Sequence, residues 1–457
     1  MPHLSRQQLT TGLLFAFVAL VAGLMPAQND TWWLLRAGQD IWQSGAVPLR
    51  DTYTHTVAGE YWPNHEWLSE AIFYGLYALG GLPLLTAAAA CAVLLSWALV
   101  WRLTPRGHWL LQPLIVAIAF IPSAMALSLR PQILTMLCVA TTATLLVRKR
   151  YAWLPPLFLV WANLHGGVFL GLAVVGGALC AELAIERRWP WPLAGALAAS
   201  GLATTLTPLG LSLWTAVPAA LARSRSYGIA EWNWPHVLEA RWAPFWALAA
   251  GLLWLSMARR PWGPALRARG CLIFAAFALV LLAVGTARNV PPAMLLLAPA
   301  VASLVSGVAS RSSGSPNERP ALNGLIVLAA AGLVVLVVGV AWTTKAARLG
   351  WQPVPPAVVA AVKGCPERLY NTYDDGGYLI WFAPEKPVFM DSRQDPFPPA
   401  LVRAHIAVER TGDYGALFRE HDIHCALLRP TSLMANRLVQ DGWQSVYADA
   451  SWVVLRN

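Results

Sequence analysis

Residues 11–45 read TGLLFAFVALVAGLMPAQNDTWWLLRAGQDIWQSG, and this stretch decides the fold class. It opens with an apolar run, 11–26, which approaches the roughly 20 helical residues needed to cross a hydrocarbon core of about 30 Å. Similar runs recur along the chain at 82–101, 110–127, 132–147, 152–164, 167–185, 192–206, 242–258, 271–287, 291–308 and 321–342. The sequence therefore predicts a polytopic α-helical membrane protein with about eleven spans, of which the short ones, 152–164 and 192–206, are tilted, broken or partly re-entrant.

Composition supports a membrane location and argues against nucleic-acid binding. The 457 residues are 57% hydrophobic and 12% charged, whereas soluble domains carry roughly 25% charged residues. The net charge of +10 is explained by Lys and Arg in cytoplasmic loops, since no basic block alternates with aromatic residues as a nucleic-acid groove requires. No A-x-A-like site follows the first apolar run, so we expect an uncleaved signal-anchor.

The distribution of basic residues predicts the orientation. Residues 148–150 and Arg187 belong to a set of loops that is richer in Lys and Arg than the alternate set. The positive-inside rule places this set, with the N-terminus, in the cytoplasm. With an odd number of spans, residues 27–81 and 343–457 then lie outside. We expect a transmembrane domain, 1–342, with 27–81 as its large outer loop, and an extracytoplasmic α/β domain, 343–457, in a bacterial inner membrane.

The outer loop 27–81 carries polar residues between two amphipathic helices. Apolar residues recur at helical spacing from Thr31 to Trp42, directly after Asp30. Asp30 is either the N-cap of that helix or a general base fixed at the membrane surface, as proton abstraction from a hydroxyl needs. Asp51 fits a turn or a substrate contact. His65 and Glu66 match no metal motif and no catalytic triad, and we predict them as substrate-binding residues.

This loop resembles the GT-C class of integral-membrane glycosyltransferases, specifically bacterial relatives of the protein mannosyltransferase and aminoarabinose transferase group. The resemblance implies that the acidic residue after the first span, Asp30, is the catalytic base while a sugar leaves a polyprenyl-phosphate carrier. Those enzymes often have two adjacent acids and a basic-Pro-Pro step, whereas Thr31 follows Asp30 here and no such step is present. The residues that carry the resemblance are Asp30, Gly45, Pro48, Gly59-Glu60-Tyr61-Trp62 and His65-Glu66-Trp67-Leu68.

Other polar residues near the spans are candidates for binding the donor. Asn163 and two glycines surround His165 in a break between helices, where His165 is a core residue, a proton shuttle or a phosphate donor. Arg130 and Arg288, near the outer boundary with Arg241, either bind a lipid phosphate or snorkel to the interface. Glu231, in the second outer loop 207–241, is a candidate sugar ligand or part of an aromatic belt.

The C-terminal domain has soluble composition and a mixed pattern of strands and helices. Strands are predicted at ERLYN (367–371), PVFMD (387–391), CALLR (425–429) and SWVVLR (451–456), and helices at 354–363, 396–421 and 431–440. Cys365 and Cys425 form a disulfide if the compartment is oxidising and the geometry permits. Asp374, Asp375, Asp391 and Asp395 are explained by turn chemistry and by pairing with Arg393, so no metal site is predicted. No nucleotide fingerprint occurs, and we predict no cofactor.

Together these features predict a glycosyltransferase that moves a sugar from a polyprenyl-phosphate-linked donor to an outer lipid, glycan or protein acceptor. Membrane lipid is a further partner, and nucleic acid is not. The alternatives are a lipid-sugar transporter or flippase, which favours internal repeats and polar breaks at the midplane, and a non-catalytic membrane scaffold. The sequence shows no internal repeat, and the polar residues gather at one predicted face.

Overall fold

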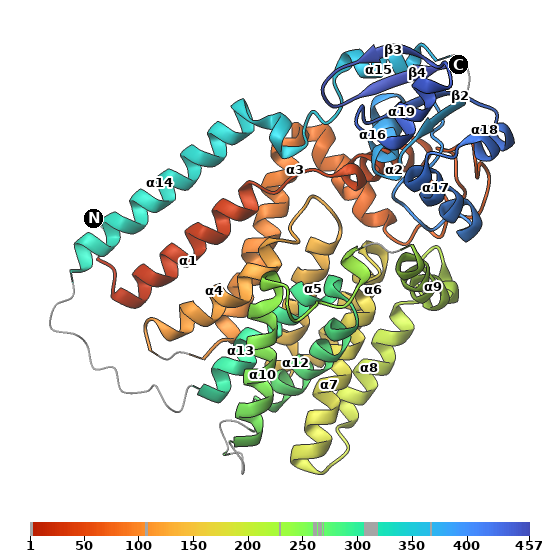
Figure 1. Ribbon diagram of the computed structural model, residues 1–457. Helices are drawn as coiled ribbons and strands as arrows, with labels where there is room; N and C mark the ends of the chain where they lie inside the picture. Colours follow the sequence, from red (N-terminus) through yellow and green to blue (C-terminus); the bar gives the residue numbers. More distant parts are fainter. Residues whose placement is uncertain are drawn as a thin grey trace. The chain divides into compact units, whose positions relative to one another are not determined.

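The computed structural model describes residues 3–105, 108–227, 230–258, 263, 267, 269–305, 319–365 and 368–457. The end of the predicted span 291–308, part of the outer loop 207–241 and two residues of the C-terminal domain lie outside these residues. The chain is mainly helical, with one small sheet near the C-terminus (Figure 1). It divides into two compact units. The helical unit is Met1–Pro26, Leu82–Gly210 and Ala230–Lys345, and the α/β unit is Ala27–Gly81, Leu211–Ile229 and Ala346–Asn457.

Each predicted apolar run falls on a helix. The helices of the helical unit are α1 (Arg6–Gly23), the second half of α3 (Trp67–Leu103), α4 (Leu111–Ala124), α5 (Gln132–Val147), α6 (Leu154–Leu164), α7 (Val168–Glu186), α8 (Trp191–Ala203), α10 (Ala243–Ala258), α12 (Gly270–Gly285), α13 (Val290–Val305) and α14 (Pro320–Thr344). By length and composition, α3, α7, α14 and the segment Ala287–Val305 are able to cross a membrane, whereas α4, α5, α8 and α12 are shorter apolar helices. The number of spans stays a prediction.

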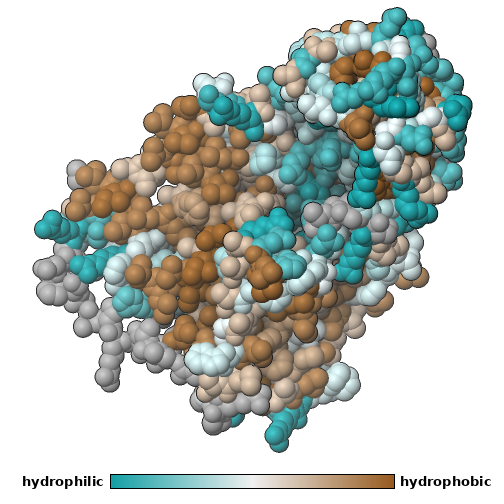
Figure 2. All heavy atoms as spheres, in the orientation of Figure 1, coloured by the Kyte–Doolittle hydropathy of each residue, from teal (hydrophilic) through white to brown (hydrophobic). Residues whose placement is uncertain are grey.

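Two helices show the range of environments inside the helical unit. In the segment Ala287–Val305, which includes α13, 83% of the most apolar 18 residues are buried, because α4, α10 and α12 all pack against α13. In α14, only 11% of the most apolar 18 residues are buried, and the main packing partner of this helix is α1. Figure 2 shows the resulting apolar surface over α1 and α14. Such a broad exposed apolar surface is unfavourable in water and suits contact with lipid.

The α/β unit combines the first outer loop with the C-terminal segment. Its helices are α2 (Asn29–Ser44), the first half of α3, α9 (Leu213–Ser226), α15 (Pro356–Lys363), α16 (Tyr373–Phe382), α17 (Pro399–Thr411), α18 (Gly415–His421) and α19 (Leu433–Gln440). The helix α2 ends where predicted, at Gly45, whose φ of 68° is the left-handed conformation that glycine adopts readily. The helix α3 is kinked at Gly80 and Gly81, where one unit gives way to the other.

Four strands form the sheet of the α/β unit in the order β1-β2-β4-β3. Strand β1 (Arg368–Asn371) is parallel to β2 (Ile423–Leu428), while β4 (Val453–Arg456) is antiparallel to β2 and to β3 (Gln444–Ala448). From Cys425 to Leu428, alternate residues of β2 belong to two separate apolar cores, as period-2 alternation requires. Trp33 and Leu34 of α2 belong to the first of these cores, so the outer-loop helix is part of this unit's hydrophobic interior.

Several predictions for the C-terminal segment are corrected by the structure. The strand predicted at 387–391 is wrong, because Val388 forms only an isolated bridge with Thr54, and Pro387 has no N–H to donate. The predicted helix 396–421 is broken into α17 and α18, and strand β3 was missed. The helix α16 was also missed, because Gly376-Gly377 resembles a loop. A Cβ on Gly377 would lie 2.4 Å from the Asn29 carbonyl oxygen, so close packing on α2 requires glycine there.

Candidate functional site

Asp30 lies in the first turn of α2 and is 8% exposed. The helix begins at Asn29 with Gln28 as its N-cap, so the interpretation of Asp30 as the cap is wrong. Its carboxylate Oδ1 instead accepts hydrogen bonds from the Trp33 indole Nε1, at 3.2 Å, and from the Ser392 hydroxyl. A carboxylate held by two side-chain donors has a fixed orientation, which a general base requires.

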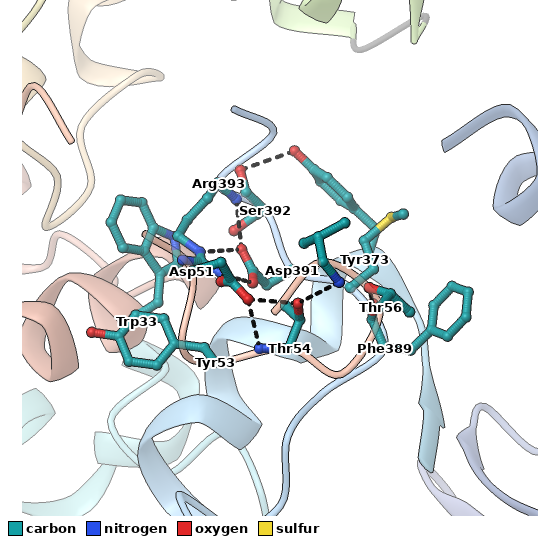
Figure 3. A network of polar contacts seen from close by, with 12 residues as sticks. Trp33, Asp51, Tyr53, Thr54, Thr56, Tyr373, Phe389, Asp391, Ser392 and Arg393 are labelled. Atoms are coloured by element: carbon teal, nitrogen blue, oxygen red, sulfur yellow. Dashed lines mark hydrogen bonds and ion pairs between the residues drawn. The ribbon is translucent and has the colours of Figure 1, made fainter. Parts of the chain in front are cut away.

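Ser392 belongs to a loop that is anchored by a buried ion-pair network (Figure 3). The Arg393 guanidinium donates from Nε and Nη2 to the two oxygens of Asp391, at 2.9 and 2.7 Å, and from Nη2 to Asp51. All three side chains are completely buried. Although burial alone would lower the pKa of Arg393, Asp391 and Asp51 raise it, so the guanidinium stays charged.

Aromatic rings complete the surroundings of Arg393. The guanidinium carbon lies 4.8 Å from the centre of the Tyr53 ring and 4.7 Å from that of Trp62, within the range of cation–π attraction. Asp51 also accepts from the Thr54 hydroxyl and backbone N–H, at 2.7 and 3.1 Å. Asp51, predicted to bind substrate, is therefore 1% exposed and occupied by protein donors, which favours a structural role.

The first turn of α16 brings further carboxylates near Asp30. Tyr373 donates from its hydroxyl to the Ser392 carbonyl oxygen at 3.0 Å. Burial and the charge of Asp30 raise the pKa of Asp374, although Arg429 opposes this shift. Asp375 pairs with Arg429 at 2.7 Å, and burial raises its pKa although Arg429 opposes this shift. The polar surroundings of Asp30 thus include a second carboxyl group from the C-terminal segment.

The predicted pair His65 and Glu66 lies directly before α3. The His65 Nε2 is 3.7 Å from a Glu66 oxygen, and both side chains are less than one-fifth exposed.

Asp395 is paired with Arg223 of α9 at 3.0 Å. Burial raises the pKa of Asp395, although His65 and Arg223 oppose this shift. The prediction that Asp395 pairs with Arg393 is replaced by this partner from the second outer loop.

In the helical unit, Arg130 and Arg288 converge on Glu231. The Glu231 oxygens lie 2.6 Å from Arg288 and 3.7 Å from Arg130, and the Trp232 ring centre lies 4.5 Å from the Arg288 guanidinium. Burial alone would raise the pKa of Glu231, but the two arginines lower it overall. Two cations share one carboxylate here, while Arg241 pairs within its own turn, with Glu239. These three side chains carry two positive charges and one negative charge, and each is partly exposed.

The surroundings of His165 define which ring nitrogen carries hydrogen. The Gly167 backbone N–H donates to Nδ1 at 3.0 Å, so Nδ1 is an acceptor. The Thr135 hydroxyl, 2.8 Å from Nδ1, then donates to the same atom and accepts from the Trp161 indole at 3.0 Å. The neutral ring therefore carries its hydrogen on Nε2. This arrangement favours a hydrogen-bond donor over a proton shuttle.

No group of three or more His, Cys, Asp or Glu side chains suited to a metal ion occurs among the described residues.

Cys365 and Cys425 are joined by a disulfide that links the segment after α15 to β2, with their Cα atoms 6.2 Å apart. A hollow of about 700 Å³ opens between the ends of α17, α18 and α19, and none of the predicted site residues lines it.

No protein-family model and no curated protein sequence matches the chain. Solved structures do match its fold. The oligosaccharyltransferase of Archaeoglobus fulgidus, tethered to an acceptor peptide, matches with a TM-score of 0.57 and 13% identity over 91% of this chain and 68% of that one. ArnT of Cupriavidus metallidurans bound to undecaprenyl phosphate matches with a TM-score of 0.52 and 15% identity over 97% and 96% of the two chains.

Both of these proteins are GT-C glycosyltransferases. The apo form of the Cupriavidus metallidurans ArnT also matches, with a TM-score of 0.54. The chain therefore has the GT-C fold, and the resemblance that the residues around Asp30 indicated is confirmed at the level of the fold.

Two important site residues were not predicted from the sequence. Ser392 is an uncharged residue between Asp391 and Arg393, and Trp33 belongs to the apolar pattern from Thr31 to Trp42. The available signal was the Asp391-Ser392-Arg393 run itself, a charged and polar cluster between apolar segments. The contact of Ser392 with Asp30 joins residues 362 positions apart, which no local pattern reveals.

Proposed function

We propose that this protein is a membrane glycosyltransferase that transfers a sugar from a polyprenyl-phosphate-linked donor to an extracytoplasmic acceptor. The N-terminus would be cytoplasmic, about eleven helical segments would span a bacterial inner membrane, and residues 27–81 and 343–457 would lie outside. The support is the GT-C fold together with a carboxylate, Asp30, immediately after the first apolar helix. That fixed carboxylate is the observation on which the proposal rests.

Asp30 is proposed as the general base. It takes the proton of the acceptor hydroxyl while the acceptor oxygen forms a bond to the anomeric carbon of the sugar. The bond between that carbon and the carrier phosphate oxygen breaks, and the phosphate leaves with the electron pair. Orienting both substrates before this step supplies much of the rate, because it removes translational and rotational entropy from the barrier.

The donor phosphate is proposed to bind Arg130 and Arg288. Arginine forks match phosphate oxygens in geometry and keep their charge at every physiological pH. Glu231 and the two arginines together carry one net positive charge, which attracts an anion. His165, with its hydrogen on Nε2, is proposed to donate a further hydrogen bond to the donor.

The other predicted substrate residues receive different roles. Asp51 is proposed as a support for the loop of Ser392, through Arg393, rather than as a ligand of the substrate. His65 and Glu66, directly before α3, remain proposed contacts for the acceptor. The acceptor itself is a lipid, glycan or protein hydroxyl group.

The experiment is transfer of radiolabelled sugar from polyprenyl-phosphate donors to membrane extracts. We expect transfer by the wild type and by Asp413→Asn, a matched change at an exposed aspartate of the same unit, and none by Asp30→Asn. Equal transfer by the Asp30→Asn protein would remove Asp30 from the mechanism. Absence of transfer by the wild type with every donor would favour a transporter or a scaffold.

A further inference from the structure

One of the side chains that hydrogen-bond to Asp30 comes from the C-terminal segment. Ser392 donates its hydroxyl hydrogen to Asp30 Oδ1 across 362 positions of sequence. The Trp33 indole reaches the same oxygen from within α2. One donor therefore comes from the helix that carries Asp30, and the other from the C-terminal segment.

The position of Ser392 is determined on both sides by fixed neighbours. Before and after it, the side chains of Asp391 and Arg393 form a completely buried fork that is anchored to Asp51 (Figure 3). The Ser392 carbonyl oxygen accepts from the Tyr373 hydroxyl at 3.0 Å. A hydroxyl whose backbone is held in this way loses little further entropy when it donates to a carboxylate, so the contact is preorganised.

Packing between α16 and α2 supports the same contact. A Cβ on Gly376 would lie 2.0 Å from the Met390 carbonyl oxygen, and a Cβ on Gly377 would lie 2.4 Å from the Asn29 carbonyl oxygen. Both glycines allow the backbone of α16 to approach the loop before Ser392 and the start of α2. The C-terminal segment is thus fitted directly against the residue next to Asp30.

From this geometry we infer that Ser392 is a positioning residue of the transfer reaction, which orients the Asp30 carboxylate toward the acceptor hydroxyl. This inference rests on the proposed function and extends it, because the C-terminal segment then contributes to the chemical step. The Asp51–Arg393–Asp391 network serves the reaction by holding the loop that carries Ser392.

The test compares Ser392→Ala, Ser392→Thr and a matched control, Ser445→Ala, which changes an exposed serine of strand β3 in the same unit. We expect Ser392→Ala to lower kcat roughly tenfold or more, the size of losing a hydrogen bond to a charged group, with the acceptor KM unchanged. Ser392→Thr keeps a hydroxyl and should restore most of the kcat. Ser445→Ala should match the wild type.

A double variant separates positioning from a general loss of structure. Because Ser392 is inferred to act through Asp30, adding Ser392→Ala to Asp30→Glu, which keeps a carboxylate but moves it out of its hydrogen bond with Ser392, should cause no further loss of the reduced rate. A kcat of Ser392→Ala equal to that of the wild type, or an additive loss in the double variant, would overturn the inference and leave the proposed function intact. A wild-type protein without any transfer would overturn both.

Discussion

Two arginine clusters in this molecule differ in how far they are withdrawn from solvent. In the α/β unit, Arg393 is completely buried between two equally buried carboxylates, Asp51 and Asp391. In the helical unit, Arg130 and Arg288 share a single carboxylate, Glu231, and these side chains are 16%, 22% and 37% exposed. The first cluster has one cation for two anions, and the second has two cations for one anion.

The comparison indicates which arginines are able to bind an anionic ligand. A buried guanidinium with two carboxylate partners has its charge satisfied within the protein, and its removal leaves uncompensated anions. A partly exposed pair with excess positive charge remains able to bind an incoming phosphate. We therefore assign structural support to the Arg393 cluster and donor binding to the Arg130–Arg288 cluster.

The largest expected effect is that of Arg393→Ala. It removes the cation that pairs with both Asp51 and Asp391 and should destabilise the α/β unit by about 3–5 kcal/mol, the cost of leaving a buried charge pair broken. Thermal unfolding in detergent measures this, with Arg437→Ala at a 59% exposed arginine as the control. A melting temperature close to that of the wild type would contradict the structural assignment.

His405, in the same unit as Arg393, is a buried ionisable side chain whose acidic neighbour, Glu409, is partly exposed, and it extends the comparison. Burial lowers the pKa of His405 to about 4, and the side chain of its neighbour Glu409 is 36% exposed. The neutral form is thus favoured in the folded state, so the stability it contributes is present above pH 6.5 and is lost as the pH falls toward 4. The loss should reach roughly 3 kcal/mol, since one pKa unit corresponds to about 1.4 kcal/mol.

The variant His405→Gln tests this pH dependence. It keeps an amide for the Tyr370 hydroxyl but cannot gain a proton. Its melting temperature should fall less than that of the wild type between pH 7 and pH 4.5. His424→Gln, at a 44% exposed histidine, is the control, and an identical acid sensitivity of all three proteins would refute the explanation.

The next largest expected effect is that of Arg288→Ala on the affinity for the donor. Losing a hydrogen bond to a charged group costs about 1.5–3 kcal/mol, so affinity for polyprenyl phosphate should fall roughly tenfold to a hundredfold. The melting temperature should change little, in contrast to Arg393→Ala. Binding of labelled carrier lipid measures the affinity, with Arg241→Ala as the matched control. Unchanged affinity would exclude Arg288 as a phosphate ligand.

The smallest effect is expected from Glu231→Gln, which removes the carboxylate that competes with the phosphate. Affinity for the carrier lipid should rise severalfold at low ionic strength. Because the pKa of Glu231 is lowered, its ion pairs persist above pH 4.5 and are lost only as the pH falls below that value. The wild type should therefore bind more tightly in that acid range. Weaker binding by the variant would show that Glu231 orients the arginines instead.

Much of the helical architecture was predictable from the sequence. Apolar runs locate helices reliably because about 20 apolar residues in a row have few other stable conformations in a membrane. Asp30 and the end of its helix at Gly45 were also located, since capping and turn preferences act over a few residues. The disulfide between Cys365 and Cys425 was left open, because spacing alone does not establish geometry.

The remainder depended on contacts between distant segments. Arg393 was expected to pair with aspartates of its own loop, and Asp391 does so, but Asp51 comes from the first outer loop and Asp395 pairs with Arg223. The helix α16 was hidden because its glycines are required by packing rather than by a turn. Such pairings depend on the tertiary fold, which local patterns do not encode.

The measurement that tests the central claim most directly separates donor binding from transfer in Asp30→Asn. Carrier-lipid binding and a single turnover of bound sugar donor are followed in the same purified protein, beside the wild type. We predict wild-type binding of the donor and no transfer of the sugar, because the base is lost while Arg130 and Arg288 are unchanged. Transfer at the wild-type rate would contradict the assignment of Asp30 as the base.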